Sequence, residues 1–427
     1  MAITKTITRI IKPRLKGGAL YYAIFVMLFL SLLSVMLLSF FEYSYKEDTL
    51  FSKQSELNDH LNSAITFLSC YPENSIPGTS QDIDLFDDGS AIVSVQSSRW
   101  GLLRKIKVKT GWKKIVRQRV VLMAEKDKQL PGLWMPDRQR YVSLVGKSYI
   151  NGDCYLSDLG LRKGNAEGRY FEGPYLHKGK IHKSEPNLPL LNSKTIQYFQ
   201  KYFSGAQTGN DSLLSPTILK RNKEIIHPFS EKSLLFKSHN RLILDNGRFE
   251  GNIIFASVDT IEVWPTVQLK NVLLLANTII VKAGFKGQLQ AFASRKIEIE
   301  KGCEFSYPSF IGAIGINTEA SVSVDENCRV NGGLVCYQSR QQENPPLLTI
   351  GKGSLVKGQV YVNGDITFSG AIHGGLLCER FIMRTSRAFY ENFMLDSYID
   401  SSRLPLEYAS FSVTGEPYKL REAVLCN

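Results

Sequence analysis

The sequence predicts a mainly β protein with a single transmembrane helix near its N-terminus. Three observations lead to this prediction: an uncharged apolar stretch, an amphipathic stretch directly after it, and a pattern that recurs about every 18 residues in the C-terminal half. The 427 residues are 43% hydrophobic and 22% charged, which excludes general disorder. A chain of this length is expected to form two or three folded domains.

The membrane segment is predicted from residues 1–41. The stretch Ala19–Phe41 carries no charge and is long enough to cross a bilayer as a helix. Residues 1–18 form a basic leader without an acidic residue, so the positive-inside rule places the leader in the cytoplasm and the rest of the chain outside. We therefore expect a single-pass protein of a bacterial inner membrane, with most of the chain in the periplasm. A cleaved secretory signal is the alternative, but Ser39–Glu42 offers no small-x-small cleavage site.

The transmembrane helix is predicted to continue outside the membrane as an amphipathic stalk over residues 42–70. This segment contains no Pro or Gly and places apolar residues at helical spacing. Tyr71-Pro72 then ends the helix. The result is one helix of about 50 residues, roughly 75 Å long.

The junction between leader and helix resembles that of type IV pilins and of the pseudopilins of type II secretion. Lys16-Gly17 is followed by Gly18-Ala19-Leu20, and a basic leader precedes one long helix. The resemblance implies cleavage between Gly17 and Gly18, and assembly of the helix with other pilus or secretion proteins. Counted from Gly18, the fifth residue is Tyr22, where major subunits carry glutamate, so the resemblance is to a minor subunit. An ordinary signal anchor with a helical stalk explains the same residues.

A mainly-β middle domain is predicted over residues 71–205, followed by a linker over 206–240. Between Asp88 and Glu125 the chain has no acidic residue and alternates Lys with β-branched residues. This pattern predicts a hairpin that turns at Thr110-Gly111 and has one cationic face. The face is a candidate surface for an anionic glycan or lipid, whereas nucleic acid is not expected because no base-reading motif is present; a solvated edge hairpin is the simpler interpretation. The cations are Arg99, Arg104, Lys105, Lys107, Lys109, Lys113, Lys114, Arg117 and Arg119.

A β-solenoid of about seven coils is predicted over residues 241–381. An apolar-x-apolar motif followed by a turn recurs in steps of 19, 18, 18, 25, 26 and 18 residues. The two long steps are explained by insertions if Ser306–Thr318 and Ser339–Pro345 are loops. Stacking such short strands satisfies their backbone groups and builds one continuous core. The repeats begin at Leu242, Ile261, Ile279, Ile297, Val322, Leu348 and Ile366.

The period and the stretch from Ile350 to Val360 resemble the bactofilin family, whose right-handed β-helices polymerise end to end. Residues 382–427 are predicted to form a C-terminal cap and tail. A capped end argues against polymerisation through that end.

The seven cysteines contain no CxxC pair, so neither a metal site nor any other cofactor is expected. Cys303 and Cys328 share one position in consecutive coils, where the stacking distance allows a disulfide. Cys336 and Cys378 are predicted to lie in the same inward column as Phe255.

The leading functional expectation is a non-enzymatic envelope protein, a minor pilin-like or pseudopilin-like component whose repeats present a binding surface. One alternative is a membrane-tethered, bactofilin-like scaffold or adhesin for a protein or glycan. Another is an extracytoplasmic carbohydrate-active β-helix enzyme, which needs clustered carboxylates. Because Asp245, Asp259, Asp325 and Asp365 occupy unlike positions in the repeats, no catalytic residue is assigned.

Overall fold

The computed structural model describes residues 18–126, 130–204, 211–220, 223–339, 343–405, 407–413 and 419–426. These residues form a mainly β protein with one long N-terminal helix. The chain divides into two compact units, residues 1–59 with 111–117, and residues 60–110 with 118–427.

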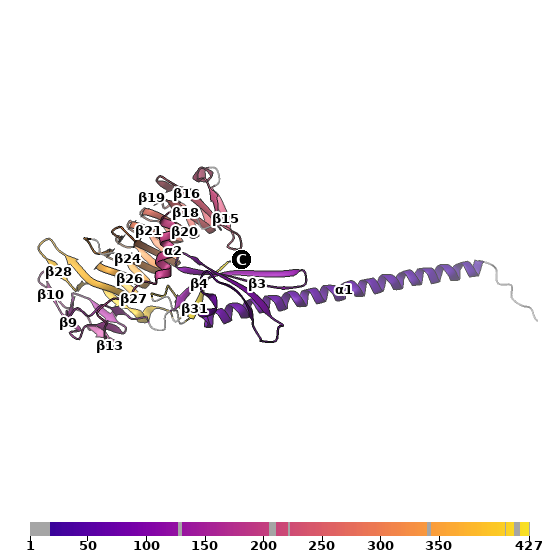
Figure 1. Ribbon diagram of the computed structural model, residues 1–427, viewed down its shortest axis with the longest axis horizontal. Helices are drawn as coiled ribbons and strands as arrows, with labels where there is room; N and C mark the ends of the chain where they lie inside the picture. The colour runs from indigo at the N-terminus through magenta and orange to yellow at the C-terminus, as the bar shows by residue number, and fades with distance from the viewer. Residues whose placement is uncertain are drawn as a thin grey trace, which may run out of the picture. The chain divides into compact units, whose positions relative to one another are not determined.

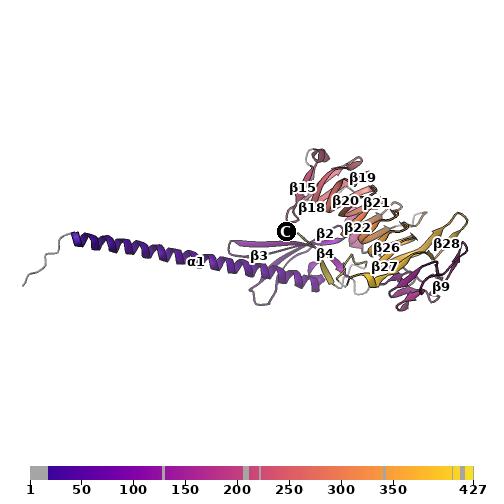
Figure 2. The same cartoon turned by 180° about the vertical axis from the view of Figure 1, so that it is seen from behind.

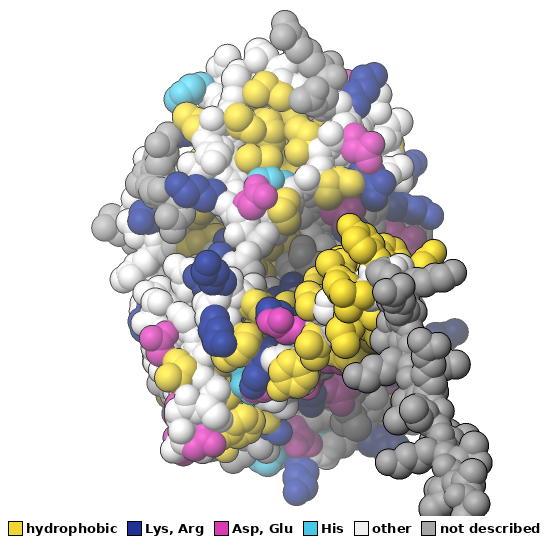
Figure 3. Space-filling model, turned by 90° about the vertical axis from the view of Figure 1, so that its right-hand side faces the viewer, with side chains coloured by type: hydrophobic (Ala, Val, Ile, Leu, Met, Phe, Trp, Pro, Cys, Tyr) yellow, Lys and Arg dark blue, Asp and Glu magenta, His cyan; other side chains and the backbone are white. Residues whose placement is uncertain are grey.

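The helix α1 runs without a break over Gly18–Cys70, so the predicted membrane segment and stalk are one helix. By length and composition α1 can cross a membrane, and none of its most apolar 18-residue window is buried. Large apolar side chains from Leu20 to Phe41 are exposed, and Figure 3 shows hydrophobic side chains gathered on this helix. The helix ends directly before Tyr71-Pro72, as predicted, because the residue before a proline disfavours the helical conformation.

A five-stranded antiparallel sheet contains the predicted hairpin as its strands β3 and β4. The predicted turn at Thr110-Gly111 is wrong, since both residues lie within β3 and the chain turns at Lys113-Lys114. Lys113 takes the positive φ of 53° that a tight hairpin turn requires, which a sequence search for glycine does not find. In sheet order the strands are β1 (Ser80–Asp84), β2 (Ile92–Trp100), β3 (Leu103–Trp112), β4 (Ile115–Lys126) and β31 (Lys419–Cys426).

The two faces of this antiparallel sheet are both buried. On one face, Ile106 and Val108 pack in a cluster with Leu61 and Leu68 from the last turns of α1. On the other face, residues such as Trp100 and Leu122 belong to a second apolar cluster that includes Phe292 and Phe310 of the repeat region. The sheet therefore lies between the end of α1 and the repeat region.

The repeat region forms a continuous set of parallel strands, called here the parallel stack, from β14 to β27. Figure 1 shows its strands following one another as successive layers. The strands are β14 (Asp211–Leu214), β15 (Glu224–His227), β16 (Ser233–Ser238), β17 (Leu242–Leu244), β18 (Gly247–Ser257), β19 (Thr260–Val263), β20 (Val267–Val281), β21 (Lys286–Ile299), β22 (Glu304–Gly315), β23 (Ser321–Val324), β24 (Arg329–Gln338), β25 (Leu347–Ile350), β26 (Leu355–Phe368) and β27 (Ala371–Arg384).

The residues that begin the predicted repeats lie directly beside one another in this stack. Every pairing is parallel, and the step from each residue to its partner is the step read from the sequence. The pairs are Leu242–Ile261, Ile261–Ile279, Ile279–Ile297, Ile297–Val322, Val322–Leu348 and Leu348–Ile366.

Two details of the predicted repeats are corrected by the structure. The predicted loop Ser306–Thr318 is largely strand, because β22 continues to Gly315 and accommodates extra residues at an irregularity between Phe305 and Ser309. Cys336 and Cys378 do share a column through Val362, but Phe255 lies in the neighbouring column that contains Leu274. Such irregularities shift the register by a residue or two, which the period does not reveal.

The parallel stack is longer at both ends than the predicted range of 241–381. At the N-terminal end, β14, β15 and β16 lie in the segment expected to be a linker. At the other end, β5 pairs with β27 at Leu133–Leu376, and β30 pairs with β27 at Ile399–Ile372. Residues 133–183, assigned from the sequence to the middle domain, thus extend the stack together with part of the predicted cap.

The strands at this end are short, and β28 lies beside β27 (Figures 1 and 2). They are β5 (Leu133–Trp134), β6 (Val142–Val145), β7 (Tyr149–Asn151), β8 (Cys154–Leu156), β9 (Leu161–Lys163), β10 (Asn165–Ala166), β11 (Arg169–Tyr170), β12 (His177–Lys178), β13 (Ile181–Lys183), β28 (Phe389–Glu391), β29 (Phe393–Leu395) and β30 (Tyr398–Asp400). A second helix, α2 (Ser193–Phe203), packs on the side of the stack, where the Phe199 and Phe292 rings lie 4.3 Å apart.

Candidate functional site

The predicted cationic surface is not a single surface in the structure. Arg104 is buried, because it lies on the same face of β3 as Ile106 and Val108. Its Nε lies 2.6 Å from Oε1 of Glu125, and both side chains are at most 4% exposed. Arg104 Nη1 also donates to the Pro72 carbonyl at 2.9 Å, so this residue holds the sheet to the segment after α1.

Several of the other predicted cations make contacts within the protein. Arg99 is half-buried, and burial lowers the pKa of its guanidinium. Lys107 Nζ donates to the Ser230 carbonyl at 3.5 Å, and Arg119 donates to the side chain of Asn62.

The remaining cations at the hairpin tip belong to the unit that contains the first part of α1. There, Arg117 donates to Gln54 at 2.7 Å, and Lys113 Nζ lies 4.3 Å from the centroid of the Trp112 ring. Lys114 is exposed, as is Lys109 in the other unit.

The predicted cleavage position lies at the edge of the described residues. Gly17 lies outside the described residues, and Gly18 is the first residue of α1. No other part of the described chain comes within 4 Å of a Cβ built on Gly18. Tyr22, the departure from the pilin pattern, is 76% exposed.

Cys303 and Cys328 are buried neighbours, but the structure holds them as free thiols. Each sulfur lies near a carbonyl, Cys303 at 3.3 Å from Lys282 O and Cys328 at 3.2 Å from Glu300 O. A hydrogen bond from Cys303 lowers the pKa of the Cys328 thiol to about 7.

The disulfide between Cys303 and Cys328 stays a prediction. We expect the two thiols to be linked in protein recovered from an oxidising compartment. Mass spectrometry of the unreduced protein measures this directly, and finding both thiols free would reject the bridge.

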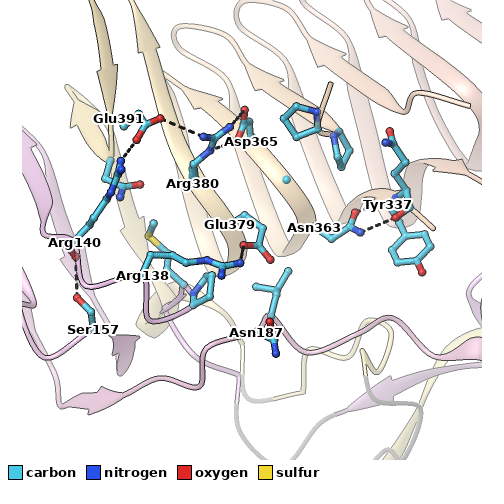
Figure 4. Close-up of a pocket in the computed structure, with 18 of the residues that line it drawn as sticks. Arg138, Arg140, Ser157, Asn187, Tyr337, Asn363, Asp365, Glu379, Arg380 and Glu391 are labelled. Carbon is cyan, nitrogen blue, oxygen red and sulfur yellow. Dashed lines mark hydrogen bonds and ion pairs between the residues drawn. The ribbon is translucent and has the colours of Figure 1, made fainter. Parts of the chain in front are cut away.

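A cavity of about 960 Å³ lies beside the end of β24 and the second halves of β26 and β27 (Figure 4). Other segments complete its wall, among them the one after β5, the one before α2 and the one before β25. Its lining is Met135, Pro136, Arg138, Arg140, Val142, Leu156, Ser157, Asn187, Leu188, Leu190, Tyr337, Gln338, Ser339, Pro345, Pro346, Asn363, Gly364, Asp365, Glu379, Arg380, Glu391 and Asn392.

A chain of ion pairs crosses one side of this cavity. Arg380 binds Asp365 through two bonds, with Nε 2.7 Å from Oδ1 and Nη2 2.9 Å from Oδ2, and its Nη1 lies 3.2 Å from Glu391. Arg140 reaches Glu391 from the segment after β5. Asp365 and Arg380 are cross-strand neighbours on β26 and β27, so the sheet register places this pair.

Further polar contacts join the segments that form the other walls of the cavity. Arg138 pairs with Glu379 at 3.2 Å. Asn363 makes two bonds of 2.9 Å with the backbone of Gln338, which joins the ends of β24 and β26. Sequence reasoning assigned none of these residues to a site. The only local signal was Asn363-Gly364-Asp365, which interrupts the apolar alternation of β26.

No group of three or more His, Cys, Asp or Glu residues in the described part of the chain could hold a metal ion. No family model matches the chain, and no curated protein matches it. Among solved structures, the chain is similar to the crystal structure of the competence-associated pilin ComZ from Thermus thermophilus. The two are 10% identical over 82% of this chain and 86% of that chain, with a TM-score of 0.25. A similarity this low establishes neither fold nor family.

Proposed function

We propose that the protein is a membrane-anchored, minor pilin-like structural component of the bacterial cell envelope. The observation that carries the proposal is the construction of α1. Its first half exposes apolar side chains on all sides, and its last turns pack through Leu61, Ala64 and Leu68 against the antiparallel sheet. One helix thus joins a membrane segment to a folded domain.

The exposed half of α1 needs an apolar environment. Burying one large aliphatic or aromatic side chain is worth about 1.5–3 kcal/mol, and this segment exposes many. A bilayer supplies that environment, and so do neighbouring helices of the same kind within it. The basic leader before Gly18 supports a cytoplasmic N-terminus, with the domain in the periplasm.

The proposal includes a β-solenoid of about seven coils over residues 241–381 as a rigid presenting surface. The parallel pairing of the repeat positions at their sequence steps supports it. A bactofilin-like polymer joined through the C-terminal end is less well supported, because β5 and β30 pair with β27 there. A tethered scaffold that is never processed at Gly17 remains the second candidate, and Tyr22 in place of glutamate is the observation that favours it.

A non-enzymatic role is part of the same proposal. Glycoside hydrolysis needs two carboxyl groups, one of them positioned to protonate the leaving group. The cavity carboxylates Asp365, Glu379 and Glu391 are each held by an arginine. Carboxylates held in this way favour binding over proton transfer.

Native Cys70 offers a direct test of membrane topology. It is the last residue of α1 and is exposed, whereas Cys154, Cys303, Cys328, Cys336 and Cys378 are buried. In a Cys426→Ser background, a membrane-impermeant maleimide added to intact spheroplasts is expected to label Cys70. A Cys70→Ser variant is the control and should remain unlabelled. Labelling that requires prior lysis would contradict a periplasmic domain.

A further inference from the structure

We propose that the cavity of Figure 4 is a binding site for a neutral oligosaccharide. The site lies wholly within residues 135–392 and uses no part of α1. The inference therefore goes beyond the membrane role, and either proposal can fail while the other stands.

The charges that line the cavity are balanced. Three arginines, Arg138, Arg140 and Arg380, face three carboxylates, and every one of the six has an ion-pair partner within the lining. An anionic or cationic ligand would gain no net attraction here and would have to displace an existing partner. The balance favours a ligand that is polar but uncharged.

The polar groups of the lining suit adjacent hydroxyl groups. Guanidinium, carboxylate and amide groups are planar and present two or more donors or acceptors side by side, as neighbouring hydroxyls of a sugar ring require. Arg138 has five N–H donors, and Glu379 accepts from one of its terminal nitrogens. Asn187 lies exposed in the wall, and Figure 4 shows it beside Glu379 and Arg138.

Apolar surfaces lie between these polar groups. Leu190 comes from the segment before α2 and Pro345 from the segment before β25, and both are exposed. Leu190 is 73% exposed, so its side chain is accessible to a ligand. Apolar groups such as these can pack against the C–H faces of sugar rings. The volume, about 960 Å³, is within the range of ligand sites.

A peptide is the other uncharged polar ligand to consider, and the strands argue against it. Peptides bind to sheets by pairing with an open strand edge. Two central strands of the cavity wall are paired along both edges: β24 pairs with β22 and β26, and β26 pairs with β24 and β27. Recognition along these two strands must therefore come from side chains, which favours a saccharide.

Calorimetric titration of the full chain, in a detergent without a sugar headgroup, tests the proposal. The probes are cellotetraose, maltotetraose and chitotetraose, with tetragalacturonate as the anionic comparison and an uncharged extended peptide as the second. We expect saturable binding of at least one neutral tetrasaccharide. Because no ion pairing is involved, its affinity should be nearly constant between about 0.05 and 0.5 M salt.

Two variants locate the binding. Asn187→Ala and Arg138→Met should each weaken it about fivefold to tenfold, the effect of one or two lost hydrogen bonds. Gln96→Ala, an exposed amide on β2, is the matched control and should bind as the unaltered protein does. Circular dichroism checks that each variant is folded, and Asn187→Ala, which removes no ion pair, decides the question if Arg138→Met unfolds. The proposal is overturned by no binding of any neutral probe, by binding only of tetragalacturonate or the peptide, or by unchanged binding in Asn187→Ala.

Discussion

Arg104→Met is expected to lower the free energy of unfolding of the sheet-containing unit by about 3–5 kcal/mol. The substitution leaves Glu125 as a buried carboxylate, 1% exposed at its side chain, without its guanidinium partner. It also removes the donors to the Pro72 and Ser75 carbonyls, which join the sheet to the segment after α1. Urea denaturation followed by tryptophan fluorescence measures the loss, since Trp100 lies at the end of β2 in this sheet.

Two control variants make this prediction specific. The double variant Arg104→Met, Glu125→Leu removes both charges and should recover much of the lost stability, because no buried charge is left without a partner. Lys109→Met removes an exposed cation from the same strand and should change stability by no more than about 0.5 kcal/mol. Equal losses for Arg104→Met and Lys109→Met would contradict the importance of the buried pair.

The periodic features of the fold were predictable from the sequence. The apolar and amphipathic stretches predicted α1, because helix geometry imposes a visible spacing on its residues. The repeat steps predicted which residues pair across the parallel stack, since stacked strands place equivalent residues side by side.

Pairing between distant segments was not predictable. The short strands of residues 133–183 and the returning strand β31 have two to eight residues each and carry no period. Their partners β27 and β4 are far away in the sequence. For the same reason the cavity was missed, because its ion pairs join residues such as Arg138 and Glu379, 241 positions apart.

The burial of Arg104 was not predicted for a different reason. The charge pattern between Asp88 and Glu125 indicated a cationic face, and the alternation along β3 does hold for Lys107 and Lys109. Arg104 has the opposite parity and points into the core with Ile106. Its partner Glu125 is the first acidic residue after Asp88, and nothing in the charge pattern indicates that the two residues pair.

We expect the leader to be removed by cleavage after Gly17. The effect of blocking this cleavage is large, because each molecule either keeps or loses the whole leader. All residues from Gly18 to Cys70 lie in α1, so a cut after Gly17 would leave this described helix intact. A bulky side chain before the cut, as in Gly17→Leu, should block the reaction and leave the leader attached. Gly89→Leu, in an exposed turn far from the leader, is the control and should be processed normally.

N-terminal sequencing of the protein extracted from membranes tests the pilin-like proposal most directly. We expect a mature terminus at Gly18 in the unaltered protein and in Gly89→Leu, with a terminus upstream of Gly18 in Gly17→Leu. A terminus at Met1 or Ala2 in the unaltered protein would contradict the pilin-like assignment and leave an unprocessed membrane tether.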